Sequence, residues 1–205
     1  MSTLEPRIHL ASQSPRRREL LAQIGVRFDL LLFRTGPRSD PATDETQHPG
    51  ETPAAYVQRV ARAKADHGTR LLQLRRLPAR PVLAADTTLD VDGEIIGKPR
   101  DDADATAILK RLSGRTHRVL TCIAVARDSR IETRLSTSEV VFRPLDDEEI
   151  HRYVASGEPH DKAGAYGIQG RAAMFVQEIR GSHSGIVGLP LCETTLLLRE
   201  FGYPL

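Results

Sequence analysis

The chain has 205 residues, of which 40% are hydrophobic, and its formal net charge is only +2. This balance excludes a protein that binds polyanions through its overall charge, and 4% aromatic residues with no tryptophan argue against a base-stacking surface. Cys122 and Cys192 lie in apolar contexts and are expected to be buried free thiols. With no secretory signal or membrane span evident, we expect a cytoplasmic protein that binds neither nucleic acid nor a membrane.

The first third of the chain predicts a strand and a helix, followed by a second strand, a loop and a long helix. An apolar run at residues 8–11 indicates a strand. Ser14 is a suitable helix N-cap, Pro15 suits the first helical position, and Gly25 ends the helix after residue 24. The second strand is expected at residues 26–33 and the long helix at residues 53–74. The loop between them, residues 34–53, is rich in Pro, Gly, Thr and Asp.

Arginines follow directly after the predicted N-cap, at positions 16, 17 and 18. The backbone N–H groups of a helix N-terminus already carry positive charge there, and each added cation costs about 0.3–1 kcal/mol. A bound anion removes this conflict, so Arg16, Arg17 and the hydroxyls of Ser12 and Ser14 predict a phosphate site. The alternative is a solvated basic turn.

A lysine interrupts the apolar face of the long helix at residues 53–74. Only four of the 29 basic residues are lysines, and Lys64 shares the helical face of Val57, Val60 and Ala61. Its side chain either extends along the apolar surface to reach solvent or meets a buried anion. Both interpretations remain open at this point.

Acidic and basic candidates follow in the middle of the chain. A short buried strand at residues 81–85 places Asp86 and Thr87 at its end, where α/β sheets often carry functional groups. Asp86 can accept a proton from water or bind a divalent ion, and the alternative is a carboxylate that caps the next turn. A hairpin at residues 89–96 leads to Lys98, whose backbone is stiffened by the proline that follows.

The second half alternates helices and strands around a glycine-rich segment at residues 161–170. Helices are expected at 101–112, 146–156 and 188–201, and strands at 117–126, 134–142 and 173–179. The hairpins make the sheet mixed, so we expect an α/β fold with two lobes around a cleft, in one domain spanning residues 1–205. A Walker A sequence, a G-x-S-x-G elbow and a histidine metal motif are all lacking.

Seven segments together resemble the Maf family of nucleoside triphosphate pyrophosphatases, in the family's order and across nearly the whole chain. They are 10–12 with 14–17 and 19–21, 63–65, 85–87, 92–99, 112–117, 161–170 and 187–191. The resemblance implies an elongated Maf/ITPase-like fold, a mixed sheet flanked by helices, and a homodimer. It also implies hydrolysis of a nucleoside triphosphate between its α and β phosphates, with Mg²⁺ or Mn²⁺ as cofactor.

The resemblance also implies roles for individual residues. Asp86 matches the family's proposed proton acceptor. The residues that match its substrate-binding set are Ser12, Ser14, Arg16, Arg17, Lys64, Thr87, Lys98 and Gln169. The loop at residues 34–52 is longer than is usual in the family, and its Asp44-Glu45 pair is the best counterpart of the family's acidic pair. Glu45 and Asp86 are therefore the expected metal ligands, with Asp40 as a weaker candidate.

Three positions distinguish branches of the family. Arg16, Thr87 and Gln169 resemble the branch that prefers dTTP and UTP, including modified uridine triphosphates, for pool cleaning or a role linked to cell division. The Gln169 amide can both donate to and accept from the O4/N3 edge of uracil or thymine. The alternatives are a 7-methyl-GTP pyrophosphatase and a non-catalytic nucleotide-binding regulator of septum formation.

Overall fold

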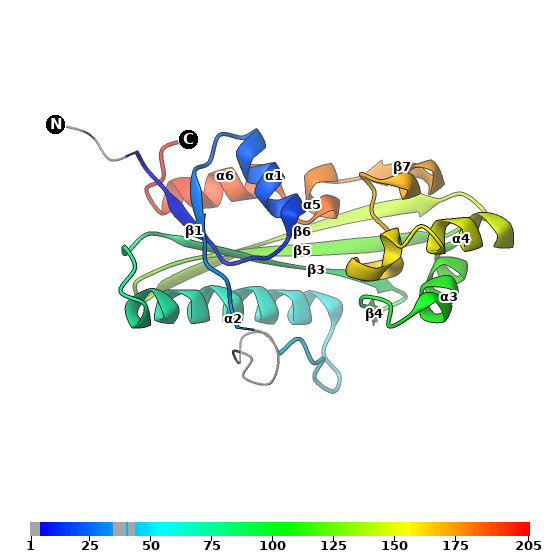
Figure 1. Cartoon of the computed structure of the whole chain (residues 1–205), viewed down its shortest axis with the longest axis horizontal. Coiled ribbons are helices and arrows are strands. Elements are labelled where there is room, and N and C mark those ends of the chain that lie inside the picture. Colours follow the sequence, from blue (N-terminus) through cyan, green and yellow to red (C-terminus); the bar gives the residue numbers. More distant parts are fainter. Residues whose placement is uncertain (1–4, 35–39, 41–43) are drawn as a thin grey trace.

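A mixed β-sheet runs through the molecule (Figure 1). The computed structural model describes residues 5–34, 40 and 44–205, so residues 35–39 and 41–43 of the predicted loop lie outside the described part. The strand order is β2-β1-β3-β5-β6-β7, with β4 paired to β3. The strands are β1 (Ile8–Leu10), β2 (Phe28–Leu30), β3 (Val82–Val91), β4 (Glu94–Ile96), β5 (Thr116–Arg127), β6 (Arg130–Phe142) and β7 (Val176–Arg180). Parallel pairing of β1 with β2 and β3, and antiparallel pairing elsewhere, confirm the predicted mixed sheet.

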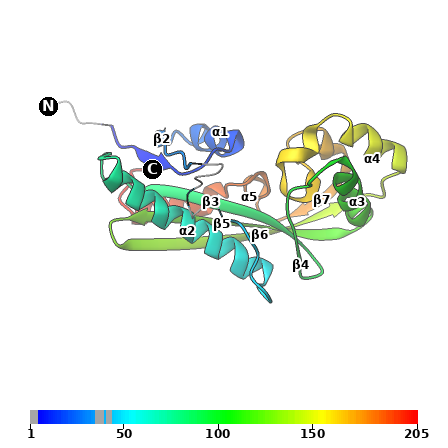
Figure 2. The same cartoon turned by 60° about the horizontal axis from the view of Figure 1, so that its bottom comes forward.

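Helices cover both faces of this sheet. They are α1 (Pro15–Gln23), α2 (Pro53–Leu74), α3 (Asp102–Leu112), α4 (Asp147–Val154), α5 (His183–Val187) and α6 (Leu191–Glu200). Helix α2 follows one face, whereas α1, α5 and α6 lie on the other, and both views show an elongated molecule with α3 and α4 at one end (Figures 1 and 2). In the described part of the chain, no helix is both long and apolar enough to cross a bilayer.

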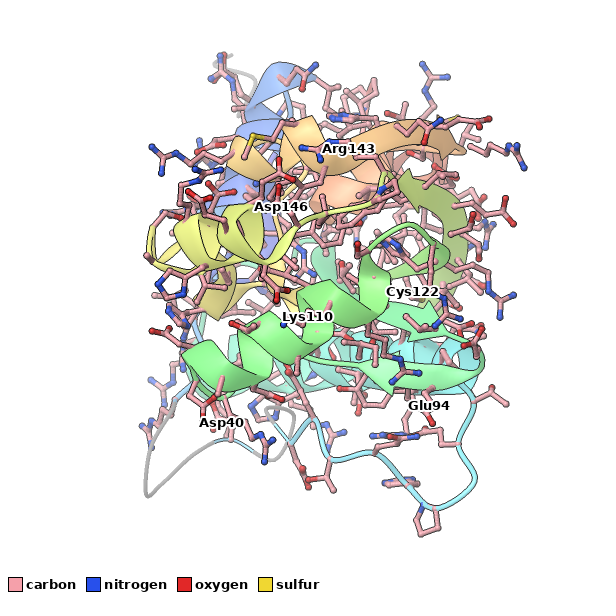
Figure 3. The ribbon with its side chains drawn as sticks, turned by 90° about the vertical axis from the view of Figure 1, so that its right-hand side faces the viewer. Asp40, Glu94, Lys110, Cys122, Arg143 and Asp146 are labelled. Atoms are coloured by element: carbon pink, nitrogen blue, oxygen red, sulfur yellow. The ribbon has the colours of Figure 1, made fainter. Side chains whose placement is uncertain are left out.

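Side-chain caps explain where the main helices begin. Ser14 accepts from the backbone N–H of Arg17, as the sequence predicts, and Thr52 caps α2 in the same way. Asp101 caps α3, and Asp146 forms a capping box with Glu149 at the start of α4. Figure 3 views this end of the molecule, with Lys110 on α3 and Asp146 beside α4. The predicted starts of these four helices are therefore confirmed to within a residue.

Three clusters of buried apolar side chains surround the middle of the sheet. One lies between α2 and the sheet and includes Val57, Val60 and Ala84. A second lies on the opposite face under α1 and α6, and a third joins α3 and α4 to the far ends of β3, β5 and β6. Strands β3 and β5 each contribute to all three clusters, so the surrounding layers share both strands.

Strand β3 differs most from its prediction. The sequence predicts a strand end at residue 85, but β3 continues to Val91 because Asp86 and the residues after it pair in register with β5. Asp86 therefore lies in the middle of a strand, and not at its end. The predicted hairpin turn is confirmed at Asp92-Gly93, where both residues have positive φ.

Smaller differences occur at both ends of the chain. β2 is shorter than the predicted strand at 26–33, and the predicted strand at 173–179 begins with a 3₁₀ turn at Arg171–Phe175 before β7. Helix α5, capped by Ser182, was not predicted, because five residues are too few to show a helical period. Cys122 is buried as expected, but Cys192 is exposed, on α6.

Candidate functional site

All ten predicted site residues line one cleft of about 510 Å³. They come from the segment that joins β1 to α1, from α1, from the loop before α2, from α2 itself, from β3, from the segment after β4 and from the glycine-rich segment. The set is Ser12, Ser14, Arg16, Arg17, Glu45, Lys64, Asp86, Thr87, Lys98 and Gln169. Two of the apolar clusters reach this cleft, since Ala11 of one and Leu89 and Ile186 of another also line it.

Lys64 joins two carboxylates at the base of this cleft. Its Nζ lies 2.8 Å from Oδ1 of Asp86 and 2.6 Å from Oε1 of Glu45. The lysine and aspartate side chains are only 13% and 9% exposed, so the lysine meets a buried anion and does not extend to solvent. Burial raises the pKa of Glu45, but the charge and hydrogen bond of Lys64 outweigh it and hold that pKa below its ordinary value.

Two side chains of α2 fix the segment that carries Glu45. The hydroxyl of Tyr56 donates to the carbonyl oxygen of Glu45 at 3.0 Å. Arg59 donates to both carboxylate oxygens of Glu51 and to the carbonyl of Thr46, and its hydrogen bonds lower the pKa of Glu51 to about 2. The Glu45 carboxylate is thus held over the same helix that supplies Lys64.

Arg17 is tied to the protein by four of its five N–H donors. Nε donates to the carbonyl of Gly188, and Nη1 donates to the carbonyl of Ala85 and to Oγ of Ser12. Nη2 donates to Oγ1 of Thr87 at 3.3 Å. Burial lowers the pKa of the guanidinium, and the negative charge of Asp86 opposes that shift. Arg17 therefore forms part of the cleft wall, with one N–H left without a partner among the described residues.

Arg16 crosses the cleft to the glycine-rich segment. Its Nη1 lies 2.9 Å from Oδ2 of Asp161, whose other oxygen accepts from Lys162 at 2.5 Å. Burial raises the pKa of Asp161, but these two hydrogen bonds outweigh it and lower the pKa to about 2. The glycine-rich segment includes Asp161 and Lys162, but the sequence predicts no role for either residue. Nothing in the sequence indicates that Asp161 pairs with Arg16 of α1.

Apolar side chains also line the cleft. Leu89, Val119, Tyr166 and Ile168 line it, and the exposed amide of Gln169 lies at its margin. A Cβ atom at Gly167 would lie 2.7 Å from Cε of Lys162, so a larger residue here would require the lysine side chain to shift. The cleft thus combines charged side chains with apolar side chains and one amide.

The carboxylates suit a divalent cation that shares its ligands with a substrate. Glu45 and Asp86 provide the oxygen donors that Mg²⁺ and Mn²⁺ prefer. No group of three or more His, Cys, Asp or Glu side chains that could hold a metal occurs in the described ranges 5–34, 40 and 44–205. Two carboxylates completed by phosphate oxygens are the usual arrangement for Mg²⁺. Asp40, the weaker candidate, does not line the cleft and pairs with His67.

Comparisons with known proteins identify the family and several relatives of this chain. A family model described as "Maf-like protein" matches residues 7–201. The chain is 64% identical over 206 residues to the dTTP/UTP pyrophosphatase of Aromatoleum aromaticum, with both chains fully covered. It is 63% identical over 197 residues to that of Dechloromonas aromatica, covering 96% and 98% of the two chains. Among solved structures, protein VC0702 from Vibrio cholerae matches with a TM-score of 0.44 and 12% identity, covering 98% of this chain and 100% of that chain.

Proposed function

The chain belongs to the Maf family, and we propose that it hydrolyses dTTP and UTP, including modified uridine triphosphates, to the monophosphate and diphosphate. The observation that carries the proposal is the base of the cleft, where Lys64 holds Asp86 at 2.8 Å beside Glu45. A carboxylate, a second acid and several cations around one cavity are what attack on a phosphoanhydride requires. The relatives named as dTTP/UTP pyrophosphatases support the same reaction.

Asp86 accepts the proton of the attacking water in this proposal. It is the least exposed carboxylate of the cleft, and Lys64 keeps one of its oxygens oriented while the other is available to water. Arg16, Lys98 and the N-terminus of α1 bind the phosphate oxygens. Within the described part of the chain, the Lys98 ammonium makes no hydrogen bond or ion pair, so it is available to a phosphate.

Glu45 and Asp86 hold the divalent cation, Mg²⁺ or Mn²⁺, in this proposal. When bound, the cation would supply positive charge that stabilises the negative charge developing on phosphate oxygens during bond cleavage. The protein itself contributes orientation, because Tyr56 fixes the backbone of Glu45 and Lys64 fixes the Asp86 side chain. Neither carboxylate needs to be reorganised by a large motion of the chain.

The apolar side chains of the cleft accommodate the base in this proposal. Leu89, Val119 and Ile168 offer apolar surface to the ring, and the Gln169 amide can pair with the O4/N3 edge of uracil or thymine. An amide both donates and accepts, as that edge requires, whereas a carboxylate would suit a cationic methylated guanine. This chemistry favours dTTP and UTP over 7-methyl-GTP.

Purified protein incubated with each nucleotide and Mg²⁺ or Mn²⁺ tests the proposal. We expect diphosphate and the monophosphate from dTTP and UTP, and a much lower rate with 7-methyl-GTP. Release of orthophosphate would contradict the assigned bond. Diphosphate release from 7-methyl-GTP alone would contradict the assigned base.

We further propose that residues 1–205 act as one catalytic domain, in a cytoplasmic homodimer. The family resemblance supports the dimer, and the family match over residues 7–201 supports one domain. Size-exclusion chromatography with light scattering tests the dimer, for which the expected mass is twice that of the 22.7 kDa chain. Elution at the mass of one chain would contradict it.

A further inference from the structure

A short series of hydrogen bonds leads from the cleft into the sheet. Nη2 of Arg17 donates to Oγ1 of Thr87, which lies 2.9 Å from Oγ1 of Thr121. Thr121 in turn donates to the carbonyl of Gly185 in α5, at 2.7 Å. Thr87 and Thr121 are direct cross-strand partners in β3 and β5, so the register of the sheet places their hydroxyls together. Thr121 is only 1% exposed and does not line the cleft.

The direction of each of these hydrogen bonds follows from counting hydrogens. A threonine hydroxyl has one hydrogen to donate and two lone pairs to accept with. A carbonyl oxygen can only accept, so Thr121 uses its one hydrogen on Gly185. Between the two threonines, Thr87 must then be the donor. Its hydroxyl has no hydrogen left for another group, and it meets Arg17 with a lone pair.

We propose that Thr121 is a positioning residue for the reaction, and that Thr87 orients Arg17 and does not donate to the substrate. Phosphate oxygens accept hydrogen bonds, so a hydroxyl whose hydrogen is already used cannot bind one. This inference rests on the proposed function for its consequence in catalysis. The hydrogen-bond directions themselves do not depend on that function.

The same series of bonds holds the residues on both sides of Asp86. Arg17 donates to the carbonyl of Ala85, directly before Asp86, and to the side chain of Thr87, directly after it. Its Nε also donates to Gly188, at the end of the helix whose Gly185 accepts from Thr121. The bonds therefore form a closed ring through α1, β3, β5 and α5. Within this ring Thr121 sets the orientation of the groups that hold Asp86.

Thr121→Val removes the hydroxyl and keeps the shape of the side chain. We expect kcat with dTTP to fall about tenfold, the loss that corresponds to one hydrogen bond, with KM changed less than about threefold. Thr121→Ser keeps the hydroxyl and should restore kcat to within about twofold of the wild type. An unchanged kcat in Thr121→Val, or an equal loss in Thr121→Ser, would overturn the proposal.

Thr194→Val is the matched control. Thr194 is also fully buried, and its hydroxyl donates to the carbonyl of Pro190, but it has no bond to the ring. The control should lose similar thermal stability while its kcat stays unchanged. An equal loss of kcat in Thr194→Val would assign the effect of Thr121→Val to general destabilisation. Should Thr121→Val not fold, Thr121→Cys takes its place, because a thiol is a much weaker donor of similar size.

A measurement without nucleotide separates this proposal from the proposed function. Hydrogen exchange at Nε of Arg17, followed by ¹⁵N NMR, reports whether the guanidinium is held in place. We expect slow exchange in the wild type and in Thr121→Ser, and at least about tenfold faster exchange in Thr121→Val. If the wild type hydrolyses no nucleotide but exchange is faster in Thr121→Val alone, the ring of hydrogen bonds is supported and the proposed function is contradicted. Identical exchange in all three proteins would refute the ring itself.

Discussion

Asp86 pairs with Lys64, and in the proposed mechanism it is both the proton acceptor and a metal ligand. Asp86→Asn keeps the size of the side chain and leaves Lys64 paired with Glu45. General-base catalysis contributes about 10²–10⁴-fold, so kcat with dTTP should fall by about that factor. Thermal unfolding should change little. Diphosphate release and a melting curve on the same preparation measure both quantities.

Asp90→Asn is the control for this substitution, on the same strand. Asp90 is also buried, but it pairs with Arg118 and accepts from the backbone N–H of Gly93, away from the cleft. It should lose stability and keep its kcat. A variant Asp86→Asn that retains near-normal kcat would remove Asp86 from the mechanism.

The Gln169 amide is the proposed reader of the base edge. Gln169→Glu replaces its donor group by a second oxygen, which would face a carbonyl oxygen of uracil or thymine. We expect kcat/KM for dTTP and UTP to fall by about 10- to 100-fold, as is usual when a site loses a hydrogen-bond donor to its ligand. Gln58→Glu, on the exposed face of α2, is the control and should leave both values unchanged. Equal kcat/KM values in wild type and Gln169→Glu would refute base recognition by this residue.

The sequence predicts a site residue where a side chain is unusual for its position. Arg16 at a helix N-terminus and Lys64 on an apolar face each violate a local rule, and the structure places both in the cleft. The partners of Lys64 could not be predicted, because the pairing depends on how the loop before α2 folds over it. Thr121 violates no rule, since threonine is common in strands, and its role becomes visible only when the register of β3 and β5 is known.

At the scale of elements, the loop before α2 is held by that helix through Tyr56 and Arg59. Tyr56→Phe removes the hydroxyl that holds the backbone of Glu45. The free energy of unfolding should fall by about 0.5–1.5 kcal/mol. Because Glu45 is a proposed metal ligand, the Mn²⁺ concentration for half-maximal activity should rise about three- to tenfold.

Tyr203→Phe makes the same chemical change at a place outside the cleft. Its hydroxyl accepts from the backbone N–H of Arg27, and the residue is buried in the cluster under α1 and α6. This control should lose comparable stability and keep the wild-type Mn²⁺ requirement. An unchanged requirement in Tyr56→Phe would show that the loop needs no such anchor.

Helix starts could be predicted because a cap acts within four residues, as at Ser14 and Asp146. The length of β3 could not, because its second half is decided by long-range pairing with β5. The sequence Asp86-Thr87-Thr88 resembles the end of a strand, and pairing with β5 keeps it extended. The consequence is functional, since a carboxylate in mid-strand is held more rigidly than one in a turn.

At the scale of the whole molecule, the cleft depends on how the apolar clusters pack around the sheet. His117 packs against Phe142 of the cluster between the sheet and α3 and α4, and its Nε2 lies 2.8 Å from the hydroxyl of Tyr166. Tyr166 in turn lines the cleft. His117 is 2% exposed, and burial lowers its pKa from 6.5 to about 4. This buried imidazole therefore links the stability of that cluster to pH.

As the pH falls, the histidine of the unfolded chain binds a proton before the buried histidine of the folded chain does. Acid therefore favours the unfolded chain. A histidine whose folded pKa is depressed stabilises the fold above pH 6.5, and that contribution is lost as pH falls toward about 4. Between pH 7.5 and 5 the two pKa values correspond to a loss of ~2 kcal/mol in the free energy of unfolding. Urea unfolding at both pH values should show this loss in the wild type and in His151→Gln, an exposed control, but not in His117→Gln. An equal loss in His117→Gln would assign the pH dependence to the carboxylates instead.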